Sequence, residues 1–325
     1  MKVTLTKSLE ERDCKKFYPI GKGGDFLKTL RELRVGRYPP AIVIKPETSL
    51  LEVMLEMNEK KVRHAIVADQ EGKLEGVVSA KYLINFMGGG DKFNKVVEEY
   101  NTDLYAALEK ETAYSIMFPY PWCSLDDSLV EVVDLMMERD IGALPVVDEN
   151  RRVVGVISEK HLMALFSDVE THVRVGEIMT PCLITLPPQA SVLEGQKIMI
   201  TNDIRRLVLK TTTGLKGILT IMDLISFYSS EKTLNMLKEK RVKEVHATPL
   251  QALDPKEIVT VDPLEDIGRA IAIMRKHGIG HLIVGDGQGI ITERDFLLKL
   301  PKVIGVDVFV DDVRKLISAG RIFFY

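Results

Sequence analysis

Residues Gly217-Ile218-Leu219-Thr220-Ile221-Met222-Asp223-Leu224 share one pattern with Gly289-Ile290-Ile291-Thr292-Glu293-Arg294-Asp295-Phe296. Two earlier copies begin Gly76-Val77-Val78-Ser79 and Gly155-Val156-Ile157-Ser158. An apolar run and a polar turn precede each copy. Two apolar runs joined by a polar turn predict a β-hairpin, and the Ser or Thr that ends the second run predicts the start of a helix. The sequence therefore contains four repeats, which define the fold.

Each hairpin also follows a predicted helix and a short strand. The apolar helix faces contain Val53, Met54 and Met57 in the first copy, Val132, Val133, Met136 and Met137 in the second, and Ile271, Ile273 and Met274 in the fourth. This spacing is typical of one face of an α-helix. The repeating unit is therefore strand, helix, strand, strand, helix.

A unit of about 55 residues is too small to be stable alone, so we expect adjacent repeats to pack in pairs. The predicted class is α/β (α+β), with pairs one-two and three-four in contact. The expected divisions are 1–34 as an N-terminal extension, 35–90 as repeat one, 91–112 as a helical linker, 113–168 as repeat two, 174–229 as repeat three, 230–241 as a linker, 242–299 as repeat four and 300–325 as a C-terminal tail.

Over roughly residues 35–300 the repeats resemble cystathionine-β-synthase (CBS) domains, four in tandem. The resemblance rests on Gly, two apolar residues and Ser or Thr, followed by Asp-Leu or Asp-Phe in repeats three and four. It implies βαββα units that pair and bind adenosine nucleotides in the cleft between paired repeats. A chain built almost wholly of such units is similar to the γ regulatory subunits of AMP-activated protein kinase and to stand-alone archaeal CBS proteins.

The resemblance and the chemistry of carboxylates predict ribose binding at Asp223 and Asp295, with nucleotide contacts from Thr220 and Thr292. A carboxylate accepts two hydrogen bonds from vicinal hydroxyls, and a helix N-terminus suits a phosphate. The alternative is that Thr-x-x-Asp only caps the helix. Repeats one and two have Tyr82 and His161 at the acid's position, which indicates that the helix does not need the acid there.

The resemblance also predicts phosphate contacts at the start of the second strand of a repeat. The residues are Arg205, Arg206, His281, Arg63 and His64. Repeat two has Gly142 and Ala143 instead, which cannot bind a phosphate. The alternative for each basic side chain is a solvated charge or a surface ion pair.

Composition excludes several other classes of protein. With 44 Lys and Arg against 47 Asp and Glu, the net charge of −3 disfavours a nucleic-acid partner. No apolar run suits a membrane span or a signal peptide, so we expect a cytoplasmic protein. Cys14, Cys123 and Cys182 lack metal-site spacing and are expected to be reduced thiols. His277 and His281 flank helix-breaking glycines, so no metal site is predicted, and Gly88-Gly89-Gly90 is interpreted as a linker.

The sequence therefore predicts a regulatory or energy-sensing protein that binds AMP, ADP or ATP as a ligand. No catalytic constellation and no cofactor are predicted. The expected partner is an unknown regulated protein, and a homodimer is possible. The alternative is a protein-interaction scaffold whose clefts hold structural ligands or none.

Overall fold

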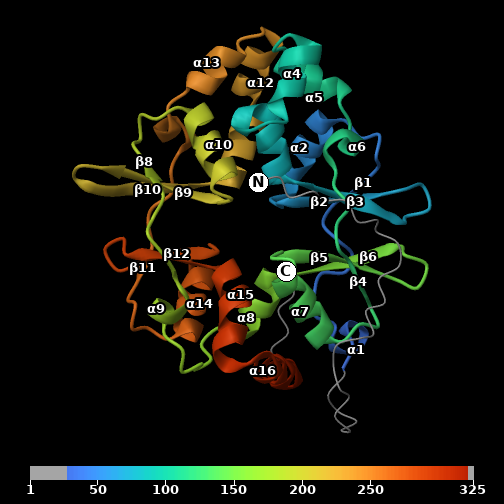
Figure 1. Ribbon diagram of the computed structural model, residues 1–325, viewed down its shortest axis with the longest axis vertical. Helices are drawn as coiled ribbons and strands as arrows, with labels where there is room; N and C mark the ends of the chain where they lie inside the picture. Colours follow the sequence, from blue (N-terminus) through green and yellow to red (C-terminus); the bar gives the residue numbers. More distant parts are fainter. Residues whose placement is uncertain (1–27, 321–325) are drawn as a thin grey trace, which may run out of the picture.

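The computed structural model describes residues 28–320, and each repeat has the predicted order of strands and helices (Figure 1). Repeat one contains β1 (Val43–Ile44), α2 (Leu50–Lys60), β2 (His64–Ala68), β3 (Leu74–Ser79) and α3 (Ala80–Ile84), and repeat two contains β4 (Cys123–Ser124), α7 (Leu129–Glu138), β5 (Ala143–Val147), β6 (Val153–Ser158) and α8 (Glu159–Leu165). Repeat three contains β8 (Thr185–Leu186), α10 (Val192–Thr201), β9 (Arg206–Thr211), β10 (Gly214–Thr220) and α11 (Ile221–Ser229), and repeat four contains β11 (Thr260–Val261), α14 (Ile267–Lys276), β12 (His281–Val284), β13 (Gly289–Thr292) and α15 (Glu293–Ile304).

Further short elements precede or join the repeats. They are α1 (Leu30–Leu33), the π-helical turn η1 (Asn85–Gly89), α4 (Phe93–Tyr100), α5 (Leu104–Lys110), α6 (Ala113–Ile116), α9 (Val175–Ile178), β7 (Thr180–Pro181), α12 (Glu231–Lys238), α13 (Val242–Ala247) and the 3₁₀ turn η2 (Leu250–Leu253). Residues 300–320, expected as part of a tail, complete α15 and form α16 (Val306–Ser318), which buries Phe309, Val310 and Val313.

Local signals set where the first helix of each repeat begins. Ser49, Ser128 and Ser191 each accept a hydrogen bond from the backbone N–H three residues later. The Glu at that later position accepts one from the serine's own N–H, which completes a capping box. Asp266 caps α14 through the N–H of Gly268. These helices therefore start where their sequences satisfy free backbone donors.

The sheets have one topology in all four repeats. The first strand is parallel to the second, as Val43 opposite Ile66 and Thr260 opposite Ile283 illustrate. The second strand is antiparallel to the third. A parallel pair requires a crossover connection, which the first helix of each repeat supplies.

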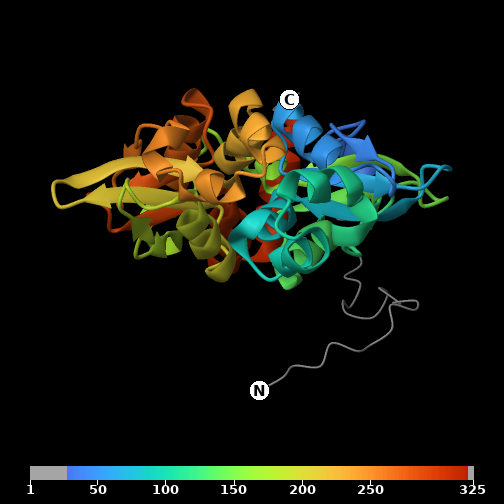
Figure 2. The ribbon, with the colours of Figure 1, turned by 90° about the horizontal axis from the view of Figure 1, so that it is seen from above.

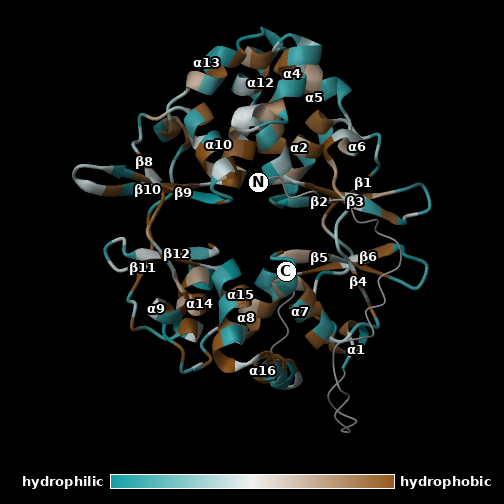
Figure 3. Cartoon of the chain, in the orientation of Figure 1, coloured by the Kyte–Doolittle hydropathy of each residue, from teal (hydrophilic) through white to brown (hydrophobic). Residues whose placement is uncertain are grey.

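Two cores join repeats of different pairs through their helices. One core contains α2 and α3 of repeat one with α10 and α11 of repeat three. The other contains α7 and α8 of repeat two with α14 and α15 of repeat four. These groups form the upper and lower halves of Figure 1, and in Figure 3 apolar residues follow the strands and parts of each helix.

Two smaller cores lie between sheets. Ile66, Leu74 and Val147 pack between repeats one and two. Val208, Ile218 and Ile283 pack between repeats three and four. The predicted pairs one-two and three-four are confirmed, and they lie side by side when the molecule is viewed from above (Figure 2).

The segment that precedes each repeat crosses to the sheet of its pair partner. One residue in each segment bridges the last strand of the partner sheet, and we name these four the crossing residues: Arg37 opposite Val156, Phe118 opposite Val77, Thr180 opposite Ile290 and Lys256 opposite Ile218. The exchange is reciprocal within each pair, so paired repeats complete each other's sheets.

This crossing explains the glycine that opens the repeated motif. A Cβ at Gly76 would lie 2.8 Å from the carbonyl oxygen of Phe118, and one at Gly289 would overlap the carbonyl oxygen of Thr180. Because the crossing backbone lies so close, only a residue without a side chain fits at this position.

The interpretation of Gly88-Gly89-Gly90 as a linker is wrong. Gly88 and Gly89 lie buried in η1, against α10. A Cβ at Gly88 would lie 2.9 Å from the imidazole of His246, and one at Gly89 would lie 3.3 Å from Gln196 Cβ. The glycines therefore allow the two pairs to approach closely.

Candidate functional site: a central Arg-Glu cluster

In each repeat, the residue just before the second strand forms a backbone hydrogen bond with the first residue of the helix that follows the hairpin. We call these the lead positions: Arg63, Gly142, Arg205 and Gly280. Their carbonyl oxygens accept hydrogen bonds of 2.9, 2.9, 2.9 and 3.2 Å from the backbone N–H of Ala80, Glu159, Ile221 and Glu293 respectively. Repeats one and three thus place arginine at the lead position, whereas repeats two and four place glycine there and glutamate opposite.

These arginines and glutamates form one cluster that joins all four repeats. Arg63 Nη2 lies 3.1 Å from Glu293 Oε2 and 3.4 Å from Glu159 Oε1. Arg205 Nη1 lies 3.3 Å from Glu159 Oε1, and Arg206 Nη2 lies 3.8 Å from Glu293 Oε2. Arg63 and Arg205 each make an ion pair with a glutamate of the other pair. The cluster therefore connects the two pairs.

The glycines at the lead positions make room for the carboxylates. A Cβ at Gly142 would overlap the carboxylate of Glu159, and one at Gly280 would overlap that of Glu293. Both glutamates are buried, and Glu159 is 1% exposed. A buried carboxylate is costly unless it is paired, which the neighbouring arginines achieve.

Positive charge exceeds negative charge in this cluster, because three arginines surround two glutamates. Burial alone would raise the pKa of Glu293, but Arg63 and Arg206 outweigh it and hold that pKa below its usual range. Burial lowers the pKa of Arg206 to about 10, although Glu293 opposes this shift. Within residues 28–320, the buried Oε2 of Glu159 has no hydrogen-bond partner. The surplus of arginine leaves the cluster with net positive charge, although this unpartnered carboxylate oxygen would itself repel an anion.

Two histidines lie within the field of these arginines. Burial, then Arg63 and Arg205, lower the pKa of His64 to about 3. Burial and then Arg206 lower the pKa of His281 to about 3. Both imidazoles are therefore neutral at pH 7, so they contribute hydrogen-bonding groups without charge.

The structure thus brings together the five residues predicted to contact phosphate, which are Arg63, His64, Arg205, Arg206 and His281. Their contact with phosphate stays a prediction. Sequence reasoning missed Glu159 and Glu293. The signal was a glutamate directly after the cap Ser or Thr in the same two repeats that have glycine at the lead position.

The two Thr-x-x-Asp segments both form helix caps. Asp223 Oδ2 accepts hydrogen bonds from Thr220 N at 2.6 Å and Thr220 Oγ1 at 2.7 Å. Asp295 Oδ2 accepts equivalent bonds from Thr292 N at 2.9 Å and Thr292 Oγ1 at 2.7 Å. Capping uses one oxygen of each carboxylate, so ribose binding at these residues stays a prediction that depends on the other oxygen.

The other oxygen of each aspartate faces a crossing residue. Asp223 Oδ1 lies 3.2 Å from the ammonium of Lys256, which is 59% exposed. Asp295 Oδ1 accepts a 2.6 Å hydrogen bond from Thr180 Oγ1. The crossing residues therefore determine how accessible each carboxylate is.

The same position has different chemistry in repeats one and two. The ring of Tyr82 lies 5.5 Å from that of the crossing residue Phe118. His161 Nδ1 accepts a 3.1 Å hydrogen bond from Ser158 N, as the acids do elsewhere. Repeat two therefore needs no acid at this position, because an imidazole nitrogen replaces the carboxylate as the acceptor.

Comparison with known proteins identifies the repeats. The CBS domain family model matches residues 31–89, 113–168, 175–230 and 243–302. This chain belongs to the CBS domain family. A 33.4 kDa protein in the ribosomal RNA operon of Thermofilum pendens is 44% identical over 297 residues, which cover 90% of this chain and 99% of that protein.

Solved structures share the arrangement of the four CBS repeats. Protein MJ1225 of Methanocaldococcus jannaschii, described as a candidate archaeal homologue of γ-AMPK, superposes with a TM-score of 0.76 at 24% identity, covering 82% of this chain and 98% of that one. A conserved protein from Pyrococcus horikoshii has a TM-score of 0.53 at 16% identity, covering 84% of this chain and 100% of that one. At these identities the likeness shows the fold.

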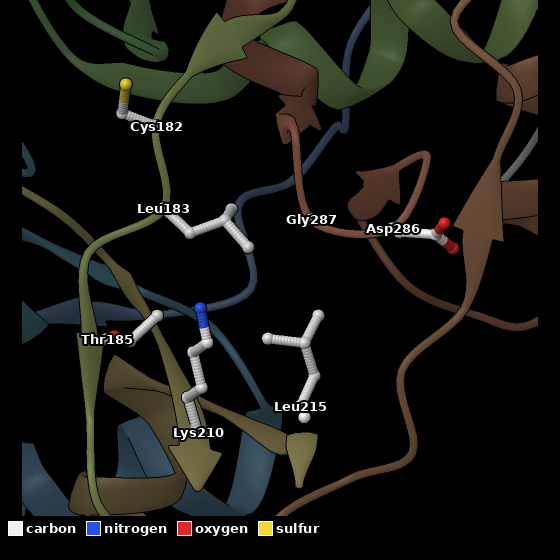
Figure 4. A pocket seen from close by; sticks show the side chains of 8 residues that line it. Cys182, Leu183, Thr185, Lys210, Leu215, Asp286 and Gly287 are labelled. Atoms are coloured by element: carbon white, nitrogen blue, oxygen red, sulfur yellow. The ribbon is translucent and has the colours of Figure 1, made fainter. Parts of the chain in front are cut away.

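A pocket of about 290 Å³ lies at the outer edge of pair three-four, among CBS residues that the sequence did not single out for binding (Figure 4). Its lining includes Leu183, Lys210 and Leu215. The thiol of Cys182 and the carboxylate of Asp286 point away from its middle (Figure 4). Of the labelled charged side chains, that of Lys210 alone points toward the middle, so several polar groups do not converge there as ligand recognition would require (Figure 4).

No helix within 28–320 has the length and apolar character to cross a membrane. Over the same range, His, Cys, Asp and Glu side chains do not gather in groups of three or more that suit a metal. Cys123 is buried and Cys182 exposed, both as free thiols, while Cys14 lies outside the described residues.

Proposed function

We propose that this CBS protein is a regulatory protein that binds an adenine nucleotide in pair three-four without transforming it. The ribose contacts Asp223 and the phosphate reaches the central cluster. The main support for this proposal is that arginines outnumber glutamates in the central cluster, where all four repeats meet. A buried positive surplus favours an anion.

The position of His281 supports placing ribose and phosphate in one ligand. The charges of Arg206, Glu293 and Asp223 all act on its imidazole. His281 therefore lies near both the central cluster and the carboxylate proposed to bind ribose. Because Asp223 belongs to repeat three and His281 to repeat four, one ligand would contact both repeats of the pair.

The cluster also supplies a route from binding to regulation. Arg63 and Arg205 each contact a glutamate of the other pair. A phosphate that binds these arginines competes with Glu293 and Glu159, and thus changes the free energy of contact between the pairs. By linkage, a partner that prefers one placement of the pairs alters nucleotide affinity.

The finer features of this proposal come from the sequence. AMP, ADP and ATP share the ribose and at least one phosphate, so Asp223 and the arginines do not separate them. On the basis of the sequence, the proposal also includes energy sensing, a cytoplasmic location, a regulated protein partner and a homodimer.

Calorimetry with the full chain tests the proposal directly. We expect AMP to bind, and Arg206→Ala or His281→Ala to weaken AMP binding while adenosine binding stays nearly unchanged. Arg269→Ala, which removes a largely exposed guanidinium paired with Asp168, is the matched control. Equal losses for AMP and adenosine would sink the phosphate assignment, and conversion of AMP during incubation would show catalysis.

One observation favours a scaffold instead. Every arginine of the cluster already has a carboxylate partner within the described chain. A scaffold without ligands predicts that no nucleotide raises the melting temperature, whereas a ligand at 100 times its Kd adds about 2.7 kcal/mol of apparent stability.

A further inference from the structure

Asp295 differs from Asp223 in how completely internal donors surround its carboxylate. Besides its two capping bonds, its Oδ1 faces Thr180 Oγ1 and the ammonium of Lys299, each at 2.6 Å. Its side chain is 7% exposed, against 15% for Asp223. Each carboxylate oxygen of Asp295 thus has two close donors.

Lys299 is held in this position by more than one contact. Its ammonium donates to Thr180 Oγ1 at 2.9 Å and to the carbonyl oxygen of Met179 at 3.1 Å. These two residues belong to the crossing segment, which adds β7 to the sheet of repeat four. An ammonium with three acceptors occupies the place where hydroxyl donors of a ribose would approach Oδ1.

The other repeats have no counterpart to Lys299. The residue one helical turn beyond the acid's position is Phe86 in repeat one, Leu165 in repeat two and Phe227 in repeat three. At Asp223 the corresponding cation is Lys256, which comes from the crossing segment and is 59% exposed. Lys256 makes this one ion pair, whereas Lys299, whose side chain is 37% exposed, is held by Asp295 of its own helix and by Met179 and Thr180 of the crossing segment.

We propose that Lys299 and Thr180 occupy the ribose-binding position of repeat four, so that Asp295 acts as a structural lock and Asp223 alone of the two aspartates binds ribose. This inference rests on the proposed nucleotide binding. It makes Lys299 the residue that limits pair three-four to one nucleotide.

The test is the number of AMP molecules bound per full-length chain, measured by calorimetry and equilibrium dialysis. We expect Lys299→Ala to raise this number by one. Lys302→Ala, an exposed lysine on the same helix, is the matched control and leaves the number unchanged. Lys299→Gln keeps much of the side-chain length without its charge and serves as the second variant, and circular dichroism confirms that each variant is folded.

The two aspartates provide a second readout. In the otherwise unchanged chain, Asp223→Ala weakens AMP binding about 10- to 100-fold, as expected for a lost hydrogen bond to a charged group. Asp295→Asn changes AMP affinity by less than about twofold, because Thr180 and Lys299 already occupy this carboxylate in the unchanged chain. It also lowers the melting temperature, which reports the loss of the lock.

The possible failures are distinguishable. If neither the unchanged chain nor any variant binds AMP, ADP or ATP, the proposed function is wrong. If the unchanged chain binds AMP at both aspartates, or if neither folded Lys299 variant gains a nucleotide, the lock is wrong while the proposed function stands.

Discussion

Arg63 and Glu293 are 230 residues apart in the sequence, and their side chains form a 3.1 Å ion pair. The pair links repeat one to repeat four, which belong to different halves of the repeat arrangement. Its formation requires that both pairs be folded and in contact. This ion pair is therefore a direct readout of how the two pairs are assembled.

Glu293→Gln should destabilise the chain and strengthen anion binding. Removing one partner of a buried ion pair costs about 3–5 kcal/mol, and because Arg63 remains partly exposed we expect the lower part of that range or less. Chemical denaturation measures this change. Inorganic phosphate should restore stability to the variant more than to the unchanged chain.

Glu257→Gln is the control for that experiment, since Glu257 is exposed. An equal gain from phosphate in the Glu293 and Glu257 variants would contradict the view that Glu293 competes with bound anions.

Acidification should destabilise the protein before its carboxylates protonate. His64 and His281 have pKa values of about 3 in the folded chain, against about 6.5 when unfolded. The unfolded state therefore binds more protons between these values, so stability is present above pH 6.5 and is lost as the pH falls. We expect a loss of about 1–2 kcal/mol per histidine between pH 7 and pH 5.

Denaturation of variants at several pH values identifies the histidines responsible. His281→Gln should reduce the slope between pH 6.5 and pH 5 relative to the unchanged chain, because it removes the imidazole whose pKa is lowered on folding. An unchanged slope in the His281 variant would show that this imidazole does not titrate as stated.

Trp122 should report which pair binds the nucleotide. It is the single tryptophan, and its ring lies 5.6 Å from the guanidinium of Arg151, also in repeat two. We expect AMP titration to leave its fluorescence unchanged while calorimetry records binding. A fluorescence change with the calorimetric midpoint that persists in Asp223→Ala would place the nucleotide in pair one-two instead.

Gly289→Ala should weaken pair three-four. The added Cβ would overlap the carbonyl oxygen of Thr180 and displace β7. Overpacking of this kind costs about 1–3 kcal/mol. Thermal denaturation measures the loss, and Asp286→Ala at the exposed end of the same hairpin is the control. A melting temperature equal to that of the control would show that the crossing segment is not held closely.

Several features of the fold were predictable because residues close together in the sequence determine them. Capping boxes at Ser49, Ser128 and Ser191 mark helix starts, and each unit's strand and helix periodicities are short-range patterns. The packing of adjacent repeats followed from their small size. The family resemblance predicted a phosphate contact for each of Arg63, Arg205 and Arg206, but their convergence in one cluster was not predictable, since no local rule states which lead positions meet.

The sequence by itself determined the four repeats, their order of elements and the residues at each equivalent position, because these depend on neighbours within one or two turns. Only the tertiary structure decided which charges compensate one another. Glu159 meets arginines from repeats one and three, and the crossing segment brings Thr180 to Asp295 over a separation of 115 residues. Such contacts follow from the docking of whole sheets and helices, so no pattern within a single repeat specifies them.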